Sequence, residues 1–163
     1  MPREGPTAGL TSVVQSVAGT GSSESESALV VGGGHVGRTV ASHLGGDYDV
    51  VFVSRNRKAV ERSTRASVTT HYAEKIDANT LGEANAEDAS LAVVASSDDG
   101  VNLLVSQLLR ATFDVENVVI RVDDRENVDS FDDLDVETVC VPDLLVAEVS
   151  ARLESVADDV AET

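Results

Sequence analysis

A glycine-rich run directly after a short apolar segment is the feature that most constrains this chain. Residues 28–31 are apolar, residues 32–37 read GGGHVG, and residues 35–44 place apolar side chains at helical spacing before two glycines. A strand, a tight glycine turn and an amphipathic helix in this order form the phosphate-binding turn of a βαβ unit. The sequence therefore predicts a loop that binds a nucleotide phosphate at the start of a helix.

The G-x-G-x-x-G spacing gives each glycine a separate role. Gly32 permits the tight turn, Gly34 lets the backbone approach a pyrophosphate, and Gly37 lets the helix pack closely against the strand. A glycine turn that holds no ligand is the alternative interpretation of the same run.

Apolar strands and helix-spaced segments alternate along the rest of the chain. Further strands are predicted at residues 50–53, 67–72, 91–95, 118–120 and 139–141. Helices are predicted from Asn56 onward, at 76–84, from 96–99 onward, at 123–131 and from Pro142 to about Val160. This rhythm predicts right-handed crossovers and an α/β, doubly wound parallel sheet, the Rossmann fold, with six strands in the order 3-2-1-4-5-6.

Two of these helices have a clear apolar stripe. The helix opened by residues 96–99 is expected to bury Val101, Leu104, Val105, Leu108 and Leu109. The last helix carries Leu144, Leu145, Ala147, Val149 and Leu153. Covering the sheet is the expected role of this last face, and a contact between two copies of the chain is the alternative.

The first part of the chain differs in composition from the rest. Gly, Ser, Thr and Glu dominate residues 1–27, which cannot bury enough apolar surface to offset the entropy of ordering. A disordered tail is therefore predicted over 1–27. Residues 28–163 are expected to form one Rossmann-type nucleotide-binding domain with a C-terminal helix.

The charge balance narrows the possible partners. The chain has 29 acidic and 12 basic residues, a formal net charge of −17. Nucleic acid is excluded as a partner because phosphate contacts need Lys and Arg. An acidic surface with so few lysines is typical of halophilic proteins, whose self-repulsion is screened in molar salt, and an ordinary acidic cytosolic protein is the alternative.

Cysteine content and hydropathy indicate a cytoplasmic location. Cys140 is the one cysteine, which excludes an internal disulfide and fits a reducing compartment, and its apolar setting favours a buried thiol. No apolar stretch reaches the roughly 20 residues that cross a bilayer, so no membrane insertion is expected. A cytoplasmic protein of this kind could also be bound peripherally at the inner face of the membrane.

The end of the second strand lacks the carboxylate that commonly binds ribose hydroxyls. The sequence there is Ser54, Arg55, Asn56, Arg57. Arginine binds phosphate through its planar fork, which favours a 2′-phosphorylated nucleotide such as NADP over NAD. The alternative is that both arginines are solvated residues at a helix start.

A polar segment, residues 96–99, follows the fourth strand at the sheet edge where such folds bind ligands. Its hydroxyls could meet a ribose or phosphate, or serve only as a helix cap, and Asn102 one turn later faces either the site or solvent. No catalytic constellation accompanies it. Tyr72 and Lys75 lie three apart, the histidines are scattered, and neither His nor Cys shows metal-ligand spacing.

Several ordered motifs resemble the N-terminal domain of the TrkA family and related RCK domains, which regulate potassium transport. The resemblance covers residues 28–153 and begins with the VVGGGHVG run. It continues with LGEANAEDA at residues 81–89, VVASSDDGVNLL at residues 93–104, and the hydrophobic-Arg-hydrophobic pattern around Arg121.

The resemblance implies a non-enzymatic regulatory module in the cytoplasm. It would bind NAD(H) or NADP(H), or ATP/ADP, and assemble as a homodimer or higher homo-oligomer beneath a membrane potassium transporter or channel. The candidate nucleotide-site residues from the loop, the end of the second strand and the resemblance are Gly32, Gly33, Gly34, His35, Val36, Gly37, Ser54, Arg55, Ser96, Asp99 and Asn102.

The chain departs from the family pattern at defined places. The family's acid after the second strand is Ser54 here, and the Gly-Asp segment after the third strand is replaced near Tyr72, Ala73 and Glu74. The resemblance does not include the C-terminal ligand-binding half of a full RCK unit, so regulation through that half is not expected from these residues. Two alternative functions follow: an NADP-linked oxidoreductase domain, or a dimerisation module with a vestigial site.

Overall fold

The chain folds around a six-stranded, fully parallel sheet with the strand order β3-β2-β1-β4-β5-β6, which confirms the predicted fold. The computed structural model describes residues 26–62 and 67–162. The strands are β1 (Glu26–Val31), β2 (Tyr48–Ser54), β3 (Val68–Tyr72), β4 (Ala89–Val94), β5 (Asn117–Val122) and β6 (Glu137–Cys140). The α-helices are α2 (Gly34–Leu44), α3 (Arg57–Glu61), α4 (Ala78–Glu83), α5 (Asp99–Gln107) and α6 (Val141–Glu162). The 3-10 helices η1 (Ala86–Asp88) and η3 (Arg125–Leu134) and the π-helical turn η2 (Leu108–Thr112) complete the described elements.

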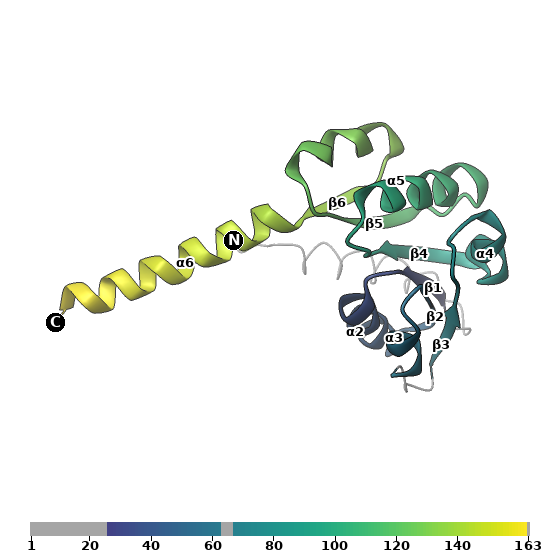
Figure 1. The fold of residues 1–163 in the computed structure, drawn as a ribbon, viewed down its shortest axis with the longest axis horizontal. Helices are drawn as coiled ribbons and strands as arrows, with labels where there is room; N and C mark the ends of the chain where they lie inside the picture. The colour runs from purple at the N-terminus through teal and green to yellow at the C-terminus, as the bar shows by residue number, and fades with distance from the viewer. Residues whose placement is uncertain (1–25, 63–66, 163) are drawn as a thin grey trace.

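The sheet has a packed core on each face because apolar residues run without interruption through its central strands. In β1, Ala28 and Val30 join the core beneath α2 and α3, while Leu29 and Val31 join the core beneath α4, α5 and η3. Figure 1 shows these helices on opposite faces of the sheet. Both cores are built mainly from aliphatic residues, as the low aromatic content requires.

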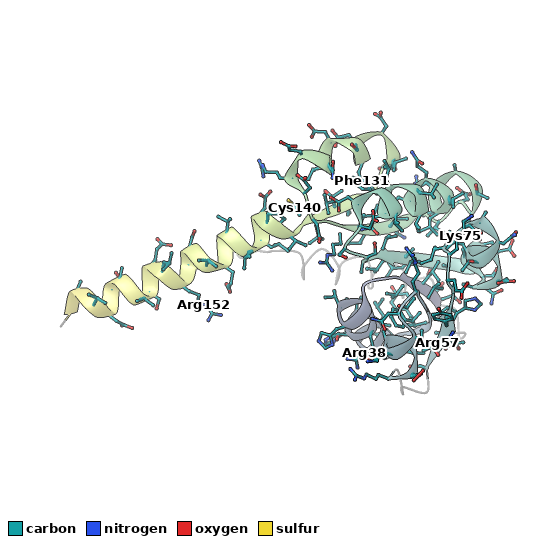
Figure 2. All side chains as sticks on the ribbon, viewed as in Figure 1. Arg38, Arg57, Lys75, Phe131, Cys140 and Arg152 are labelled. Atoms are coloured by element: carbon teal, nitrogen blue, oxygen red, sulfur yellow. The ribbon has the colours of Figure 1, made fainter. Side chains whose placement is uncertain are left out.

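The last helix differs from the prediction. We expected its apolar face to cover the sheet, but α6 projects away from the domain (Figure 1), and every described side chain from Asp143 to Ala161 is exposed. Figure 2 shows the contrast between side chains crowded around the sheet and those of α6, which radiate from an isolated rod. An amphipathic pattern identifies the apolar face of a helix but not the surface that this face contacts.

The buried face of α5 is a second correction. Leu104, which we expected in the core, is 49% exposed, whereas Asn102 and Ser106 are fully buried beside Val105 and Leu109. The buried residues at positions 102, 105, 106 and 109 follow helical spacing. The buried face of α5 is therefore rotated about the helix axis relative to the apolar face that we predicted. The polar pair is tolerated there because both side chains form hydrogen bonds.

Smaller differences concern element ends. Glu26 and Ser27, which the prediction assigned to a disordered tail, are the first residues of β1, and the rest of that predicted tail lies outside the described residues. The helix expected over 123–131 is the 3-10 helix η3, and α5 continues into a π-helical turn at η2. No helix within residues 26–62 and 67–162 has the length and apolarity of a membrane span.

Candidate functional site

The glycine run lies in a groove at the carboxyl edge of the sheet, beside the point where the chain reverses its winding between β1 and β4. Parallel sheets of this kind bind ligands at such a position. The groove has a volume of about 490 Å³. Its lining comprises Gly32, Gly33, Gly34, Ser54, Arg55, Asn56, Ile76, Ser96, Ser97, Asp98, Val101 and Arg121. A smaller hollow of about 260 Å³ at the opposite edge is walled by the starts of β1 and β2 and has no comparable loop.

The loop between β1 and α2 passes closer to its neighbours than side chains would allow. A methyl group added at Gly37 would stand 1.8 Å from the carbonyl oxygen of Gly32 and 2.9 Å from the ring of Phe52. A methyl group at Gly34 would meet one side-chain atom, the amide nitrogen of Asn56 at 3.6 Å. Gly37 thus holds the helix against the sheet, while Gly34 leaves its backbone open to the groove.

The start of α2 faces this open space without a capping side chain. Gly33 is the residue before the helix, no acid occupies the first turn, and the first backbone N–H groups of any helix lack partners within it. His35 and Val36 are both exposed and neither lines the groove, and Nδ1 of His35 lies 2.8 Å from a guanidinium nitrogen of Arg38. Both residues lie in the first turn of α2, beside the glycine loop.

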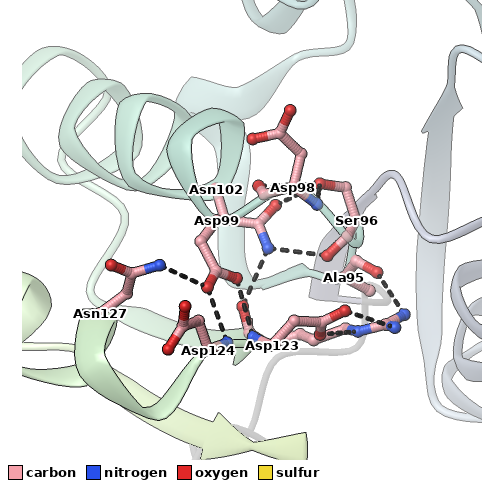
Figure 3. A network of polar contacts seen from close by, with 9 residues as sticks. Ala95, Ser96, Asp98, Asp99, Asn102, Asp123, Asp124 and Asn127 are labelled. Atoms are coloured by element: carbon pink, nitrogen blue, oxygen red, sulfur yellow. Dashed lines mark hydrogen bonds and ion pairs between the residues drawn. The ribbon is translucent and has the colours of Figure 1, made fainter.

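The segment after β4 is held in a fixed shape by Asn102. The Asn102 amide donates to the backbone carbonyls of Ser96 (2.8 Å) and Arg121 (2.9 Å), and the hydroxyl of Ser96 donates to its oxygen (2.7 Å). Figure 3 shows this network joining α5 to the ends of β4 and β5. Asn102 is buried and does not line the groove, so it positions Ser96 and the strand end.

Asp99 connects the same segment to the turn after β5 (Figure 3). Its carboxylate accepts from the backbone N–H groups of Asp123 (2.8 Å) and Asp124 (2.9 Å) and from the side chain of Asn127 (2.9 Å). Burial by itself raises the pKa of Asp99, but these donors and the Arg121 charge lower that pKa overall. Asp99 does not line the groove, and its role here is to hold two loops together.

Arg121 is a groove residue that the sequence indicated only through the family pattern. Its guanidinium forms a two-pronged ion pair with Asp123, at 2.6 and 3.1 Å, and donates to the Ala95 carbonyl at 3.3 Å. A bidentate pair of this kind fixes the guanidinium plane. The arginine thus places a partly compensated positive charge at the wall of the groove.

The end of β2 forms the corner of the groove nearest to α3. Ser54 is buried, and its hydroxyl oxygen accepts from the backbone N–H of Asn56 at 2.9 Å. Asn56 caps α3 by accepting from the N–H of Ala59 at 3.1 Å. Arg55 is exposed and lines the groove, while the guanidinium of Arg57 stacks 4.1 Å from the centre of the Tyr72 ring.

The structure thus gathers part of the candidate set. The lining includes Gly32, Gly33, Gly34, Ser54, Arg55 and Ser96. Five candidates lie behind or beside it: His35, Val36, Gly37, Asp99 and Asn102. Lining residues absent from the candidate set are Asn56, Ile76, Ser97, Asp98, Val101 and Arg121. Most of these residues follow a predicted strand or begin a predicted helix, and this position in the sequence could have identified them as candidates. No group of three or more metal-ligating side chains occurs among the described residues.

Fold and groove together define a Rossmann-type domain with a glycine-loop site at its switch point. The model of the TrkA-N domain matches residues 28–142, and the chain belongs to this family.

Relatives and a solved structure agree with this placement. The chain is 28% identical over 129 residues to a Trk system potassium uptake protein TrkA homolog of Archaeoglobus fulgidus, a match that covers 77% of this chain and 29% of the relative. It is 30% identical over 105 residues to the Trk system potassium uptake protein TrkA of Mycobacterium tuberculosis (strain H37Rv), covering 64% and 48%. The NAD(P)-binding domain of an exopolyphosphatase-related protein from Archaeoglobus fulgidus has the same fold, with a TM-score of 0.65, 20% identity and coverage of 78% and 97%. This chain covers less than half of the length of each of the two TrkA relatives.

Proposed function

We propose that this chain is a nucleotide-binding regulatory module, without catalytic activity of its own, for a membrane potassium transporter or channel. The observation that carries the proposal is the glycine-loop groove at the switch point of a TrkA-N family fold. Potassium transport is proposed as the regulated process because two relatives are named Trk system potassium uptake proteins. The module would act in the cytoplasm, at the inner face of the membrane, and the acidic surface fits work in molar salt.

The groove fits a nucleotide because its two ends offer different chemistry. At the start of α2, backbone N–H groups and the helix dipole favour a phosphate, and Gly34 lets the phosphate approach the backbone. Across the groove, Ile76 and Val101 offer apolar surface against which a base could pack. NAD(H), NADP(H) and ATP or ADP share the phosphate that this arrangement would bind.

A chain of polar contacts connects the groove to the projecting helix, which gives the proposed regulation a route. Ser96 lines the groove, and Asp99 three residues later binds the backbone at Asp124. Arg125, the first residue of η3, pairs with Asp143 in the first turn of α6. A ligand that moves Ser96 would therefore bias the base of α6. The exposed ion pair contributes little energy by itself, so the three hydrogen bonds that the partly buried Asp99 carboxylate accepts would carry most of this coupling.

A second copy of this chain is the partner that best fits α6. Five apolar residues follow the 3,4 spacing of a coiled-coil seam and are 46–67% exposed: Val146, Val149, Leu153, Val156 and Val160. A helix of 22 residues spans about 33 Å, long enough for two heptads. A self-complementary seam pairs naturally across a two-fold axis. We call these five residues the α6 seam.

The oligomeric state of the protein tests whether a second copy of the chain pairs with α6. Sedimentation in molar KCl, which screens the acids of α6, is expected to give a dimer for the wild type and a monomer for Leu153→Asp. Ala151→Asp, which adds the same charge to the same helix outside the seam, should leave the dimer intact. A monomeric wild type, or a Leu153→Asp variant that stays dimeric, would contradict this pairing.

Ligand binding tests the function itself. Equilibrium dialysis against NADH, NADPH, ATP and ADP in molar KCl should detect at least one ligand. Gly34→Asp should abolish that binding, because the new carboxylate would face the phosphates at the open side of the loop. Gly34→Asn has nearly the same shape and backbone demands without the charge, so it should retain more affinity than the aspartate variant. Absence of binding by all four ligands would refute the nucleotide part of the proposal.

A further inference from the structure

The corner of the groove at the end of β2 offers hydrogen-bond donors where this type of fold commonly offers an acceptor. A ribose 2′-hydroxyl is usually bound by an Asp or Glu carboxylate at this corner. Here the corner residue is Ser54, whose oxygen already accepts from the N–H of Asn56. Asp98, the acidic residue of the groove lining, belongs to the loop after β4 and caps α5 through Val101.

Two donors occupy this corner. The side-chain oxygen of Asn56 caps α3, and its amide nitrogen lies 3.6 Å from where a Gly34 methyl group would stand, so this NH₂ group is close to the glycine loop. Arg55 lines the groove from the exposed side. In the parts of the chain that the structure describes, Arg55 has no hydrogen bond or ion pair to another side chain. Its guanidinium is therefore available to a ligand.

The charges around this corner contrast with the rest of the molecule. Residues 55–62 contain four of the chain's 12 basic residues and one acid, in a chain of net charge −17. Within the described residues, four arginines elsewhere form ion pairs with acids: Arg110–Asp135, Arg121–Asp123, Arg125–Asp143 and Arg152–Glu148. Of the two arginines that line the groove, Arg121 is paired with Asp123 and Arg55 has no acidic partner among the described residues, so the Arg55 guanidinium is the one that suits a dianionic group.

We infer that Arg55 is a specificity-determining residue that makes the groove select 2′-phosphorylated adenine dinucleotides, NADP(H), over NAD(H). The inference rests on the proposed nucleotide site and names its ligand class. A 2′-phosphate has only acceptor oxygens, which match the guanidinium of Arg55 and the amide of Asn56. A 2′-hydroxyl presents a proton, for which this corner lacks a carboxylate. Stacking on Tyr72 directs the next arginine, Arg57, toward β3.

Paired affinities test this inference, because NADPH and NADH differ only in the 2′-phosphate. Both dissociation constants are measured by the fluorescence of the reduced nicotinamide in the same molar KCl, which screens the long-range effect of the protein's net charge on the more highly charged ligand. Wild-type protein should bind NADPH at least about 10-fold more tightly than NADH, as expected for one charge-assisted contact. Arg55→Gln should weaken NADPH binding by about 10- to 100-fold and change NADH binding by less than about 3-fold.

Lys58→Gln is the matched control. Lys58 lies in the same basic segment and its loss changes the net charge equally, but it does not line the groove. Both affinities should stay within about 2-fold of the wild type, a change of well under 1 kcal/mol. Both replaced side chains are exposed, and circular dichroism checks that the variants remain folded.

The outcomes separate this inference from the proposed function. NADH binding as tight as NADPH binding, or an Arg55→Gln variant that weakens both ligands equally, overturns the role of Arg55 and leaves the nucleotide site standing. Binding of ATP or ADP without either dinucleotide also overturns this inference alone. Absence of binding by all four nucleotides overturns both proposals.

Discussion

Replacing Gly37 by alanine is expected to be among the most damaging single-methyl changes in the protein. The added carbon would stand 1.8 Å from the Gly32 carbonyl oxygen, where real contacts of this kind lie above about 3 Å. The loop or the helix must therefore move by more than 1 Å, and Phe52 at 2.9 Å blocks one direction of escape. Overpacking usually costs about 1–3 kcal/mol, and a backbone clash of this depth should cost at least about 3 kcal/mol.

Gly82→Ala provides the control for this experiment. Gly82 lies within α4, and a methyl group there would make ordinary contact with the Phe113 ring at 3.9 Å. Alanine at a helical position free of clashes should stabilise by about 0.5–1 kcal/mol. The assay is urea unfolding followed by circular dichroism in molar KCl. A Gly37→Ala variant within about 0.5 kcal/mol of the wild type would refute the close packing of α2 on the sheet.

Three further changes probe the polar groups and the charge. Asp99→Asn should lower the free energy of unfolding by about 1.5–3 kcal/mol at neutral pH, since it loses charged acceptors for three donors. Folding lowers the pKa of Asp99, so the stabilisation by its carboxylate is complete above the unfolded pKa of about 3.9 and is lost as the pH falls through the folded pKa. The difference in unfolding free energy between wild type and Asp99→Asn should therefore shrink in acid. An equal difference at pH 7 and well below about pH 4 would contradict this. Tyr48→Phe should stabilise by about 1 kcal/mol in urea unfolding, because the buried Tyr48 hydroxyl has no partner within the described residues, and a loss of stability would count against this. Raising KCl from about 0.1 M to about 2 M should raise the unfolding midpoint of a chain of net charge −17, and an unchanged or lower midpoint would argue against screened self-repulsion.

Sequence patterning predicted the sheet because its information is local and repeated. The central strands β1, β2, β4 and β5 each contain a short apolar run, and parallel topology follows from the alternation of strands with helices. The groove followed from the same logic, since the loops after β1, β2 and β4 must meet at one edge. These features depend on residue types close together in the chain.

The remaining features depend on partners that patterning does not specify. Leu104 was expected in the core and is exposed, whereas Asn102 was expected to face the site or solvent and is buried. Asn102 is tolerated there because it donates to the backbone carbonyls of Ser96 and Arg121, which belong to other segments. The apolar face of α6 is visible in the sequence, but its partner surface is not. Ile76 and Arg121 line the groove because the segments after β3 and β5 converge in space, and the family pattern around Arg121 does not by itself show that convergence.

The position of the bound nucleotide tests the central claim most directly. Proton–nitrogen correlation spectra of the labelled protein, recorded during titration with NADPH in molar KCl, report each backbone amide separately. We expect shifts concentrated at Gly32, Gly33, Gly34, Ser96 and Ser97, and none at the opposite hollow, whose lining includes Ser27 and Asp49. Unchanged groove amides at saturating ligand, or shifts centred on that opposite edge, would contradict the central claim.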